Sequence, residues 1–318
     1  MVKNGVALFF IVSAILTSFL GACMLAPEGP VPSVQIEPAF PLDVTDQAGR
    51  VVTIEKMPET IVSLSPGHTE IVFALGLEDR LVGVTTLCNY PEAAKDKPKI
   101  GGYSTVDIEK VVEIQPDLIL ATRIHEAEVI PALERLGLAV LNLYPKTLDE
   151  VLEAITLVGK CTGKEDVASQ LVTEMGKRIK VVTDKTANLT EAQRPRVFYV
   201  VRHDPLWTIG ADHRIHELIV LAGGVNIAQD LSGSTTISLE AVIEANPQVI
   251  IASSSMGAAE SALEFLKTYE RLRDVDARIN NQVYEIDANP ISRAGPRIVD
   301  ALELLAKMIH PEIFGSIE

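Results

Sequence analysis

The sequence predicts an α/β protein made of two similar lobes, each with a mostly parallel sheet, that are joined by one long backbone helix. Short β-branched runs alternate with helical periods in both halves of the chain, which is typical of parallel strands covered by helices. The segment at 104–121, STVDIEKVVEIQPDLILA, recurs at 235–252 as TTISLEAVIEANPQVIIA, which indicates a repeated unit. An amphipathic helical stretch at 165–184 separates the two halves.

The N-terminal residues predict export. Lys3 precedes an apolar run that ends in Leu20-Gly21-Ala22-Cys23, so residues 1–22 are interpreted as a signal peptide. The run has about the length of a short membrane helix, and an uncleaved signal anchor is the alternative. The last four residues resemble the bacterial lipobox, which implies cleavage before Cys23 and a diacylglyceryl thioether on its sulfur.

Residues 23–42 are predicted to form an extended tether, because 24–42 hold five prolines and little apolar periodicity. The formal net charge is −15, which disfavours nucleic acid and anionic lipid surfaces as partners. The lipid alone is therefore expected to hold the protein at the membrane. Cys88 and Cys161 lie in unrelated local settings, so free or buried thiols are expected, with a disulfide as the alternative.

Residues 43–146 are predicted to form the N-terminal α/β lobe. Its expected strands are 61–64, 81–84, 117–121 and 139–143, separated by helices at 69–75, 106–113 and 127–136. Pro116 stops the second of these helices before an apolar strand.

Residues 147–194 are predicted to be the linking helices. Thr147-Leu148-Asp149-Glu150 has the form of a capping box, so a helix is expected to begin there. Gly159 and Gly163 are expected to interrupt it. The following stretch, 165–184, is expected to act as a stiff strut of about 30 Å between the lobes; packing on one lobe alone is the alternative.

Residues 195–318 are predicted to form the C-terminal α/β lobe, with the same order of elements. The expected strands are 197–201, 249–252 and 283–286, and the expected helices are 215–221, 239–244 and 296–309.

The residues then reveal a resemblance that covers nearly everything after the tether. The segments IVSLSPGHTEIVFALG, NYPEAAKDKPKIGGYSTVDIEKVVEIQPDLILA and ISRAGPRIVDAL resemble the helical-backbone substrate-binding proteins of ABC importers that carry cobalamin, ferric siderophores or haem. The resemblance implies a ligand cleft between the lobes, little closure on binding, and no catalysis. It also implies delivery of a small-molecule metal chelate to a permease dimer with its ATPase subunits. We expect a monomer outside the cytoplasm, in a periplasm or on the outer face of the plasma membrane.

The repeat places one glutamate at matching positions of the two lobes. The resemblance implies that Glu109 and Glu240 dock onto basic residues of the two permease subunits. Glu113 and Glu244 match equally well and are an alternative pair, and all four could be ordinary solvated helix residues.

The resemblance also implies which loops face the ligand. Tyr103 aligns with a stacking aromatic of the cobalamin binders, and Arg293 matches a cleft arginine that could hold ligand oxygens. The polar loop VVRHDPLWTIG adds Arg202, His203 and Trp207 as candidates, because ligand contacts concentrate in loops that follow strands.

Three positions depart from the cobalamin pattern, because Leu87, Thr122 and Ser234 stand where those binders place aromatics. His68 is a further ligand-binding candidate. Together with His125 and His203, it could supply an axial ligand to the cobalt or iron of the cargo.

No catalytic or resident-cofactor motif is found in the sequence. His213 and His216 are three apart but do not match His-Glu-x-x-His, and surface histidines at a helix start are the commoner case. Segment 63–67 lacks the first glycine of a nucleophile elbow, and 159–165 is too short for a phosphate loop. The prediction is a binding protein with a corrinoid as cargo, and a ferric siderophore or haem as the alternative. An exported metal-cofactor-handling enzyme is the alternative of another class.

Overall fold

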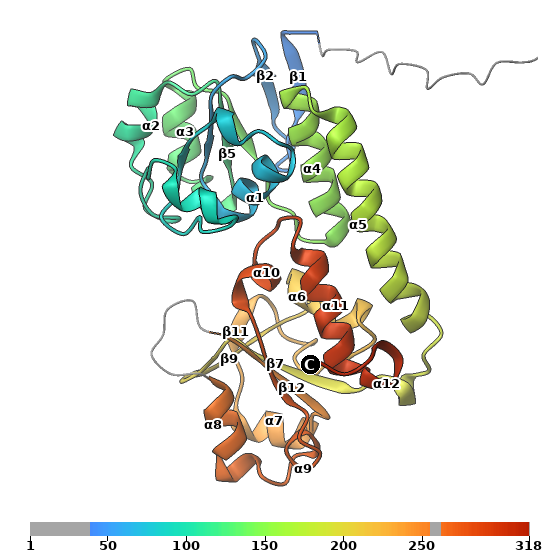
Figure 1. Cartoon of the computed structure of the whole chain (residues 1–318). Coiled ribbons are helices and arrows are strands. Elements are labelled where there is room, and N and C mark those ends of the chain that lie inside the picture. Colours follow the sequence, from blue (N-terminus) through green and yellow to red (C-terminus); the bar gives the residue numbers. More distant parts are fainter. Residues whose placement is uncertain (1–38, 255–261, 318) are drawn as a thin grey trace, which may run out of the picture. The chain divides into compact units, whose positions relative to one another are not determined.

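The computed structural model describes residues 39–254 and 262–317 (Figure 1). The predicted signal peptide, the predicted lipidation site Cys23 and most of the predicted tether lie outside the described residues. Among the described helices, none combines the length and the apolar character that crossing a membrane requires.

The N-terminal lobe is built on a four-stranded parallel sheet with the order β4-β3-β5-β6. The strands are almost entirely buried because helices cover the sheet, as is usual for parallel sheets. The elements are β3 (Ile61–Ser63), α1 (Pro66–Ala74), β4 (Leu81–Val84), α2 (Ile108–Ile114), β5 (Leu118–Ala121), α3 (Val129–Glu134) and β6 (Val140–Asn142). The strands and helices expected from the sequence of this lobe are present.

A small antiparallel hairpin that the sequence did not predict precedes this sheet. It consists of β1 (Leu42–Thr45) and β2 (Val51–Ile54). The Asp46 carboxylate closes its turn by accepting hydrogen bonds from the amides of Ala48 and Arg50. The Arg50 guanidinium also donates to the carbonyl oxygen of Val140, at 3.0 Å, and so ties the hairpin to β6.

Two antiparallel helices link the lobes, α4 (Leu148–Thr162) and α5 (Glu165–Thr186). Thr147 caps α4 as predicted, since its Oγ1 accepts from the Glu150 amide at 3.2 Å. The Glu150 carboxylate, however, accepts from the Lys146 amide rather than from Thr147. Gly163 ends α4 in a left-handed conformation.

The prediction that Gly159 interrupts this helix is wrong, because Gly159 lies inside α4. Its missing side chain lets the two helices approach closely, and a Cβ there would collide with the Ala168 methyl group of α5. With 22 residues, α5 is about 33 Å long.

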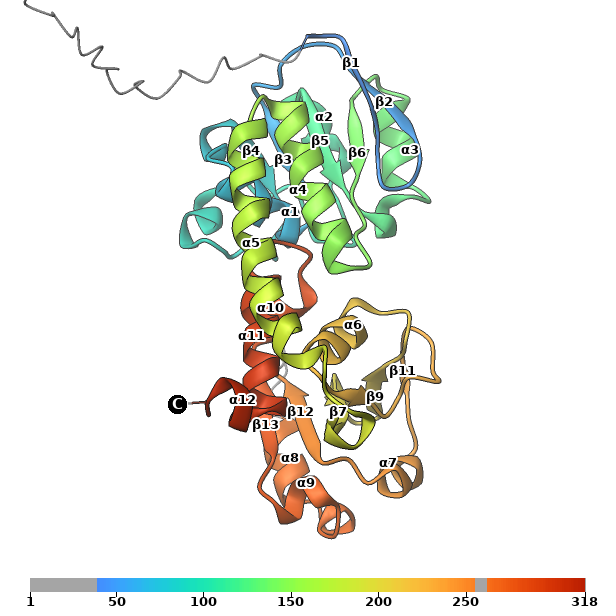
Figure 2. The same cartoon turned by 90° about the vertical axis from the view of Figure 1, so that its right-hand side faces the viewer.

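The long helix runs alongside α4 and continues to the C-terminal lobe (Figure 2). It packs against α4, and against α6 (Arg214–Leu221) and α11 (Ile298–Ile309) of the C-terminal lobe. Farther along, the Arg178 guanidinium binds the carboxylates of Asp300 and Glu303, each at 2.6 Å. Both acids belong to α11. One cluster of buried apolar side chains runs from the N-terminal lobe through α4 and α5 to α11, so the linker is packed along its length and is stiff.

The C-terminal lobe repeats the parallel arrangement with the strand order β10-β7-β12-β13. Its main elements are β7 (Arg196–Val200), α6 (Arg214–Leu221), β10 (Val225–Asn226), α7 (Leu239–Ala245), β12 (Val249–Ser253) and β13 (Val283–Ile286). A separate antiparallel sheet joins β8 (Arg202–His203), β9 (Leu206–Ile209) and β11 (Ser234–Thr236). Short helices α8 (Ala262–Thr268), α9 (Asp276–Ile279), α10 (Ala288–Ser292) and α12 (Pro311–Phe314) complete the lobe.

The sequence repeat corresponds to equivalent units, α2–β5 and α7–β12. Asp107 caps α2 by accepting from the Lys110 amide at 3.2 Å, and Ser238 caps α7 by accepting from the Ala241 amide at 3.1 Å. Each helix ends at a residue in the left-handed region, Gln115 with φ 49° and Asn246 with φ 43°. The two units therefore repeat their local backbone geometry as well as their sequence.

The two cysteines of the described chain, Cys88 and Cys161, are buried free thiols. Burial raises the pKa of the Cys161 thiol to about 12, so this group is a structural side chain rather than a reactive one.

Candidate functional site

A cavity of about 300 Å³ lies between the two lobes. Both lobes line it. The N-terminal lobe contributes Ser65, Pro66, His68, Leu87, Tyr103, Thr122, Leu143, Tyr144, Pro145 and Lys146, and the C-terminal lobe contributes Asp212, His213, Arg214, Ser292, Arg293 and Ala294. Ser65, Thr122 and Leu143 lie just past the carboxyl ends of β3, β5 and β6. This edge of a parallel sheet is where α/β proteins usually bind ligands.

Tyr103 lines the cavity on a loop that glycine makes possible. Gly101 has φ 102°, and a Cβ there would lie 2.6 Å from both the Thr105 oxygen and the Asp107 nitrogen. The Tyr103 ring meets the His125 ring edge-on, with 5.9 Å between centroids. Burial raises the pKa of the Tyr103 hydroxyl, so the phenol is neutral and presents a ring and a hydrogen-bonding group to the cavity.

His125 holds the Tyr103 loop in place through hydrogen bonds. Its Nε2 lies 2.8 Å from the Tyr103 carbonyl oxygen, and its Nδ1 accepts from the Thr122 amide at 3.1 Å. Because Nδ1 accepts, Nε2 carries the proton and donates to the carbonyl. Both ring nitrogens are therefore occupied, and burial lowers the pKa of His125. His125 positions Tyr103 in this arrangement.

His68 lies in α1 and lines the same cavity, although its side chain is almost wholly buried. Nε2 lies 3.1 Å from the Leu143 carbonyl oxygen. Nδ1 is buried without a hydrogen-bond partner among the described residues. Burial lowers the pKa of His68 to about 4, so the imidazole is neutral at physiological pH.

The C-terminal lobe supplies Arg214, at the start of α6. Its guanidinium donates to the carbonyl oxygens of Pro145, at 2.5 Å, and Ser292, at 2.9 Å. Its Nε is buried without a partner within the described part of the chain. Burial lowers the pKa of Arg214, but arginine stays protonated in proteins. The cavity wall therefore contains a largely desolvated cation.

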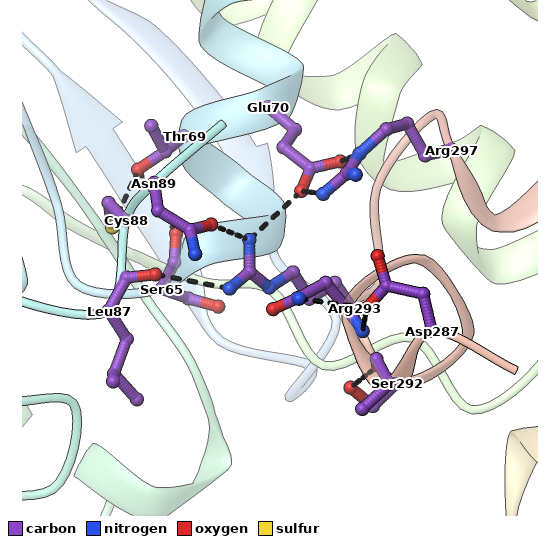
Figure 3. A network of polar contacts seen from close by, with 12 residues as sticks. Ser65, Thr69, Glu70, Leu87, Cys88, Asn89, Asp287, Ser292, Arg293 and Arg297 are labelled. Carbon is purple, nitrogen blue, oxygen red and sulfur yellow. Dashed lines mark hydrogen bonds and ion pairs between the residues drawn. The ribbon is translucent and has the colours of Figure 1, made fainter. Parts of the chain in front are cut away.

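Arg293 also lines the cavity, but its guanidinium is engaged with the opposite lobe (Figure 3). Nη1 donates to the Asn89 side-chain oxygen at 2.7 Å and lies 3.5 Å from a Glu70 oxygen. Nη2 donates to the Leu87 carbonyl oxygen at 3.1 Å. Arg293 therefore reaches the cavity as part of a contact between the lobes.

Arg202, His203 and Trp207 gather on the β8–β9 hairpin and are not among the residues that line the cavity. The Arg202 guanidinium lies 5.6 Å from the centroid of the Trp207 ring. His203 stacks on Phe265 of α8 with 4.8 Å between centroids. The structure thus brings Tyr103, His68 and Arg293 together at the cavity and places these three side chains in a separate aromatic group.

A second hollow, of about 740 Å³, is lined by the N-terminal lobe and by Glu150 and Glu153 of α4. The two hollows share Tyr144 and Lys146. Arg123 stands at the side of the second hollow, with its guanidinium 5.4 Å from the centroid of the Tyr144 ring. Tyr144 and Lys146 therefore contribute to the walls of both hollows.

Sequence reasoning did not single out Tyr144, Lys146 or Arg214 as candidates. Tyr144 and Lys146 follow β6 directly, and the rule that ligands bind past the carboxyl ends of parallel strands could have found them. Arg214 gave no such signal, because its role depends on a contact with Pro145 that only the assembled lobes create.

Glu109 and Glu240 occupy equivalent places as the second residues of α2 and α7, and both are exposed. Glu240 forms an ion pair with Arg271 at 2.7 Å, which lowers the pKa of the Glu240 carboxyl. Glu109 has no ion pair within residues 39–254 and 262–317. Both side chains are therefore accessible to a partner.

The two histidines at the start of α6 have local hydrogen bonds. His213 caps the helix, because its Nδ1 accepts from the Ile215 amide at 3.1 Å, and burial lowers its pKa to about 4. Nδ1 of His216 lies 3.3 Å from the side-chain nitrogen Nδ2 of Asn226. Within the described residues, no group of three or more His, Cys, Asp or Glu side chains is arranged to hold a metal ion.

Comparison with protein families gives a match over most of the chain. A family model for periplasmic binding proteins matches residues 61–290, which include both parallel sheets and the linking helices. A relative in Bacillus subtilis (strain 168), an uncharacterized ABC transporter substrate-binding lipoprotein (YvrC), is 33% identical over 283 residues, which are 86% of this chain and 87% of that protein.

Two solved structures resemble the fold closely. The periplasmic vitamin B12 binding protein of Vibrio cholerae is 29% identical, with a TM-score of 0.68, over 80% of this chain and 97% of that one. A periplasmic haem-binding protein in complex with two haems is 26% identical, with a TM-score of 0.72, over 80% of this chain and 99% of that one.

Proposed function

We propose that this chain, which belongs to the periplasmic binding protein family, captures a corrinoid of the cobalamin type and delivers it to the permease of an ABC importer. The likeness to an ABC transporter substrate-binding lipoprotein and to a vitamin B12 binding protein supports the proposal. A binding protein needs a site for its cargo and a surface for its permease, and both have candidates among the described residues.

The observation that carries the proposal is the cavity between the lobes, with Tyr103 in its wall. Ligand sites are usually concave, largely apolar and equipped with a few polar groups. A volume of about 300 Å³ holds only part of a corrinoid, so the macrocycle would lie partly outside. The second hollow, which shares Tyr144 and Lys146 with the cavity, is a candidate surface for the remainder.

Haem or a ferric siderophore is the second candidate, and the charge of the cavity wall favours it. Lys146, Arg214 and Arg293 line the cavity, against Asp212 as the one carboxylate in the lining. Guanidinium and ammonium groups pair well with carboxylates, which a haem or many siderophores carry. Leu87 and Thr122 in the wall leave fewer aromatic surfaces for a corrin ring.

Anchoring by lipid is part of the same proposal. Cleavage before Cys23 and acylation of its sulfur would hold the chain at the outer side of the membrane through the tether. Cys23→Ser removes both the acylated sulfur and the cleavage motif, so labelled palmitate fed to the cells should enter the wild-type protein and not the variant. Absence of the label from the wild-type protein would contradict the lipid anchor.

The cargo is tested by calorimetric titration of the chain from residue 23, with Cys23→Ser, using cyanocobalamin, haemin and a ferric siderophore in parallel. Saturable one-to-one binding of cyanocobalamin tighter than about 1 µM, which is about 8 kcal/mol, supports the corrinoid. Binding of haemin or the siderophore without binding of cyanocobalamin would contradict the corrinoid proposal and favour the second candidate. Binding of none would leave the family membership intact and remove both cargo proposals.

A further inference from the structure

A buried ionic contact between the lobes lies beside the interlobe cavity and shares Arg293 with the cavity wall (Figure 3). Glu70 lies in α1 of the N-terminal lobe, and its side chain is 2% exposed. Its carboxylate accepts two hydrogen bonds from the Arg297 guanidinium of the C-terminal lobe, at 3.0 Å from Nε and 2.6 Å from Nη2. The Arg297 guanidinium also lies 3.7 Å from the centroid of the Tyr90 ring. Arg297 is thus held in two ways by the opposite lobe.

Arg293 forms a second arm of the same contact. It donates hydrogen bonds to the Asn89 side chain and the Leu87 carbonyl oxygen, in the loop that also carries Tyr90. Its Nη1 lies 3.5 Å from Oε1 of Glu70, which Arg297 also binds. The C-terminal lobe therefore holds both α1 and the 87–90 loop of the N-terminal lobe.

The backbones of the two lobes meet at the same point. A Cβ on Gly67 would lie 2.7 Å from the Ala294 carbonyl oxygen, and a Cβ on Gly295 would lie 3.0 Å from the Gly67 oxygen. The lobes can approach this closely only because both positions are glycine. Leu87, Arg293 and Ala294 of this contact also line the cavity, so a change in the contact changes the cavity wall.

The electrostatics make this contact sensitive to the separation of the lobes. A buried carboxylate is costly unless cations and hydrogen bonds compensate it. Every cation on Glu70 in the described structure comes from the other lobe. Moving the lobes apart would break charge-assisted hydrogen bonds before water could replace them in full, so the contact favours one separation.

We propose that Glu70, Arg293 and Arg297 form an interlobe clamp that sets the width of the cargo cavity, with Glu70 and Arg297 as positioning residues that do not touch cargo. Arg297 is the more tightly held of the two arginines, because it binds the Glu70 carboxylate with two hydrogen bonds and stacks on the Tyr90 ring. Arg293 is the arm that also reaches the cavity wall. The effect on cargo affinity rests on the proposed function, whereas the effect on lobe separation does not.

Spin labels at exposed Ile124 and Val201, one on each lobe, test the separation without any ligand. Ile124→Cys and Val201→Cys are introduced into the chain from residue 23 with Cys23→Ser, in which Cys88 and Cys161 stay buried. Pulsed electron paramagnetic resonance then gives the distance distribution. The clamp predicts one narrow population, and a broadened or shifted distribution with Glu70→Gln, which keeps the shape of the side chain and removes its charge.

Glu92→Gln is the matched control, because Glu92 belongs to an exposed ion pair within one lobe and should leave the distribution unchanged. If Glu70→Gln fails to fold, the double variant Glu70→Gln with Arg297→Gln removes the anion and its main cation together. An unchanged distribution in a folded clamp variant would overturn the proposal.

The dissociation constant for cyanocobalamin, or for whichever cargo the titration identifies, provides the second readout. If loss of the clamp leaves one molecule in ten with the binding-competent width, the apparent dissociation constant rises about tenfold. Arg297→Lys, which keeps the charge but loses the bidentate geometry, should lie between wild type and Glu70→Gln in both readouts. A wild-type protein that binds none of the three cargoes would remove the cargo proposal, while the spin-label distances would still decide the clamp.

Discussion

At the residue scale, the cavity wall combines an aromatic ring with polar groups that the fold has largely desolvated. Tyr103 presents a neutral phenol, His68 a neutral imidazole, and Arg214 a cation with a buried, unpartnered Nε among the described atoms. Desolvation strengthens each polar interaction that a ligand makes, because the local dielectric is low. A few groups of this kind can therefore orient a large cargo that is otherwise bound through apolar surface.

Tyr103 should contribute to affinity through its ring. Replacing it with Ala is expected to weaken binding of cyanocobalamin about tenfold, or roughly 1.4 kcal/mol, because a stacking surface is lost. Tyr103→Phe keeps the ring and should stay close to wild type. Titration calorimetry measures both, and equal affinity of the Ala variant would show that the ring does not contact the corrinoid.

His68 should make stability depend on pH. Its pKa is about 4 in the folded protein and about 6.5 when unfolded. Between these values the unfolded chain binds a proton that the folded chain does not, so stability rises with pH. This contribution is complete above pH 6.5 and is lost as pH falls through 4, and it amounts to about 3 kcal/mol at most.

Urea unfolding at pH 7 and at pH 4.5 tests this expectation. His68→Gln cannot take up the proton, so its free energy of unfolding should fall less between the two pH values than that of wild type. The comparison uses the change with pH within each protein, which separates the titration from any packing defect. An identical change in the two proteins would contradict a buried neutral His68.

At the scale of elements, the sequence predicted seven of the eight parallel strands and the main helices, because apolar runs alternate there with helical periods. It missed the parallel strand β10, the antiparallel hairpins β1–β2 and β8–β9, and β11. Pairing with a distant segment defines β10 and β11, as for Ser234 opposite Ile209. Tyr103 was a candidate because the resemblance implied it, whereas Arg214 is placed at the cavity by its contact with Pro145 of the other lobe.

The linking helices allow a prediction from two glycines with different surroundings. Gly176 lies in α5 and a Cβ there would meet nothing within 4 Å, whereas a Cβ on Gly159 in α4 would collide with Ala168. Gly176→Ala should stabilise the protein by about 0.5–1 kcal/mol, because alanine loses less backbone entropy in a helix. Gly159→Ala should destabilise it by about 1–3 kcal/mol through overpacking.

Thermal and urea unfolding measure the stability of both variants. Each variant is the matched control for the other, since both replace a glycine by alanine in a linking helix. Stabilisation by Gly159→Ala would show that α4 and α5 separate easily, and would weaken the view of the linker as a stiff strut.

At the scale of the whole molecule, the two lobes present the same unit to the outside, with a glutamate at the same place. α2 and α7 match in length, N-terminal cap and left-handed C-terminal residue. A pair of related surfaces suits a permease with two related subunits. The stiff linker and the contacts of Glu70 with Arg297 would hold the two surfaces at a fixed spacing, so that they can engage together.

Reversing the charge of both glutamates should therefore uncouple binding from transport. We expect Glu109→Lys with Glu240→Lys to abolish cargo uptake in cells and to leave the dissociation constant unchanged, since neither residue lines the cavity. An exposed ion pair contributes only about 0–1 kcal/mol, but reversal replaces two attractions by two repulsions against basic residues and impairs orientation and encounter. The ion pair between Glu240 and Arg271 is exposed, so its loss should cost little stability.

Glu113→Lys with Glu244→Lys is the matched control, because these glutamates lie on the same two helices, are exposed and change the net charge by the same amount. Uptake that falls with the first pair and persists with the second identifies Glu109 and Glu240 as the docking residues. The opposite result would assign docking to the neighbouring pair four residues along each helix. Normal uptake by both double variants would exclude these helix faces as the permease contact, whatever cargo the cavity holds.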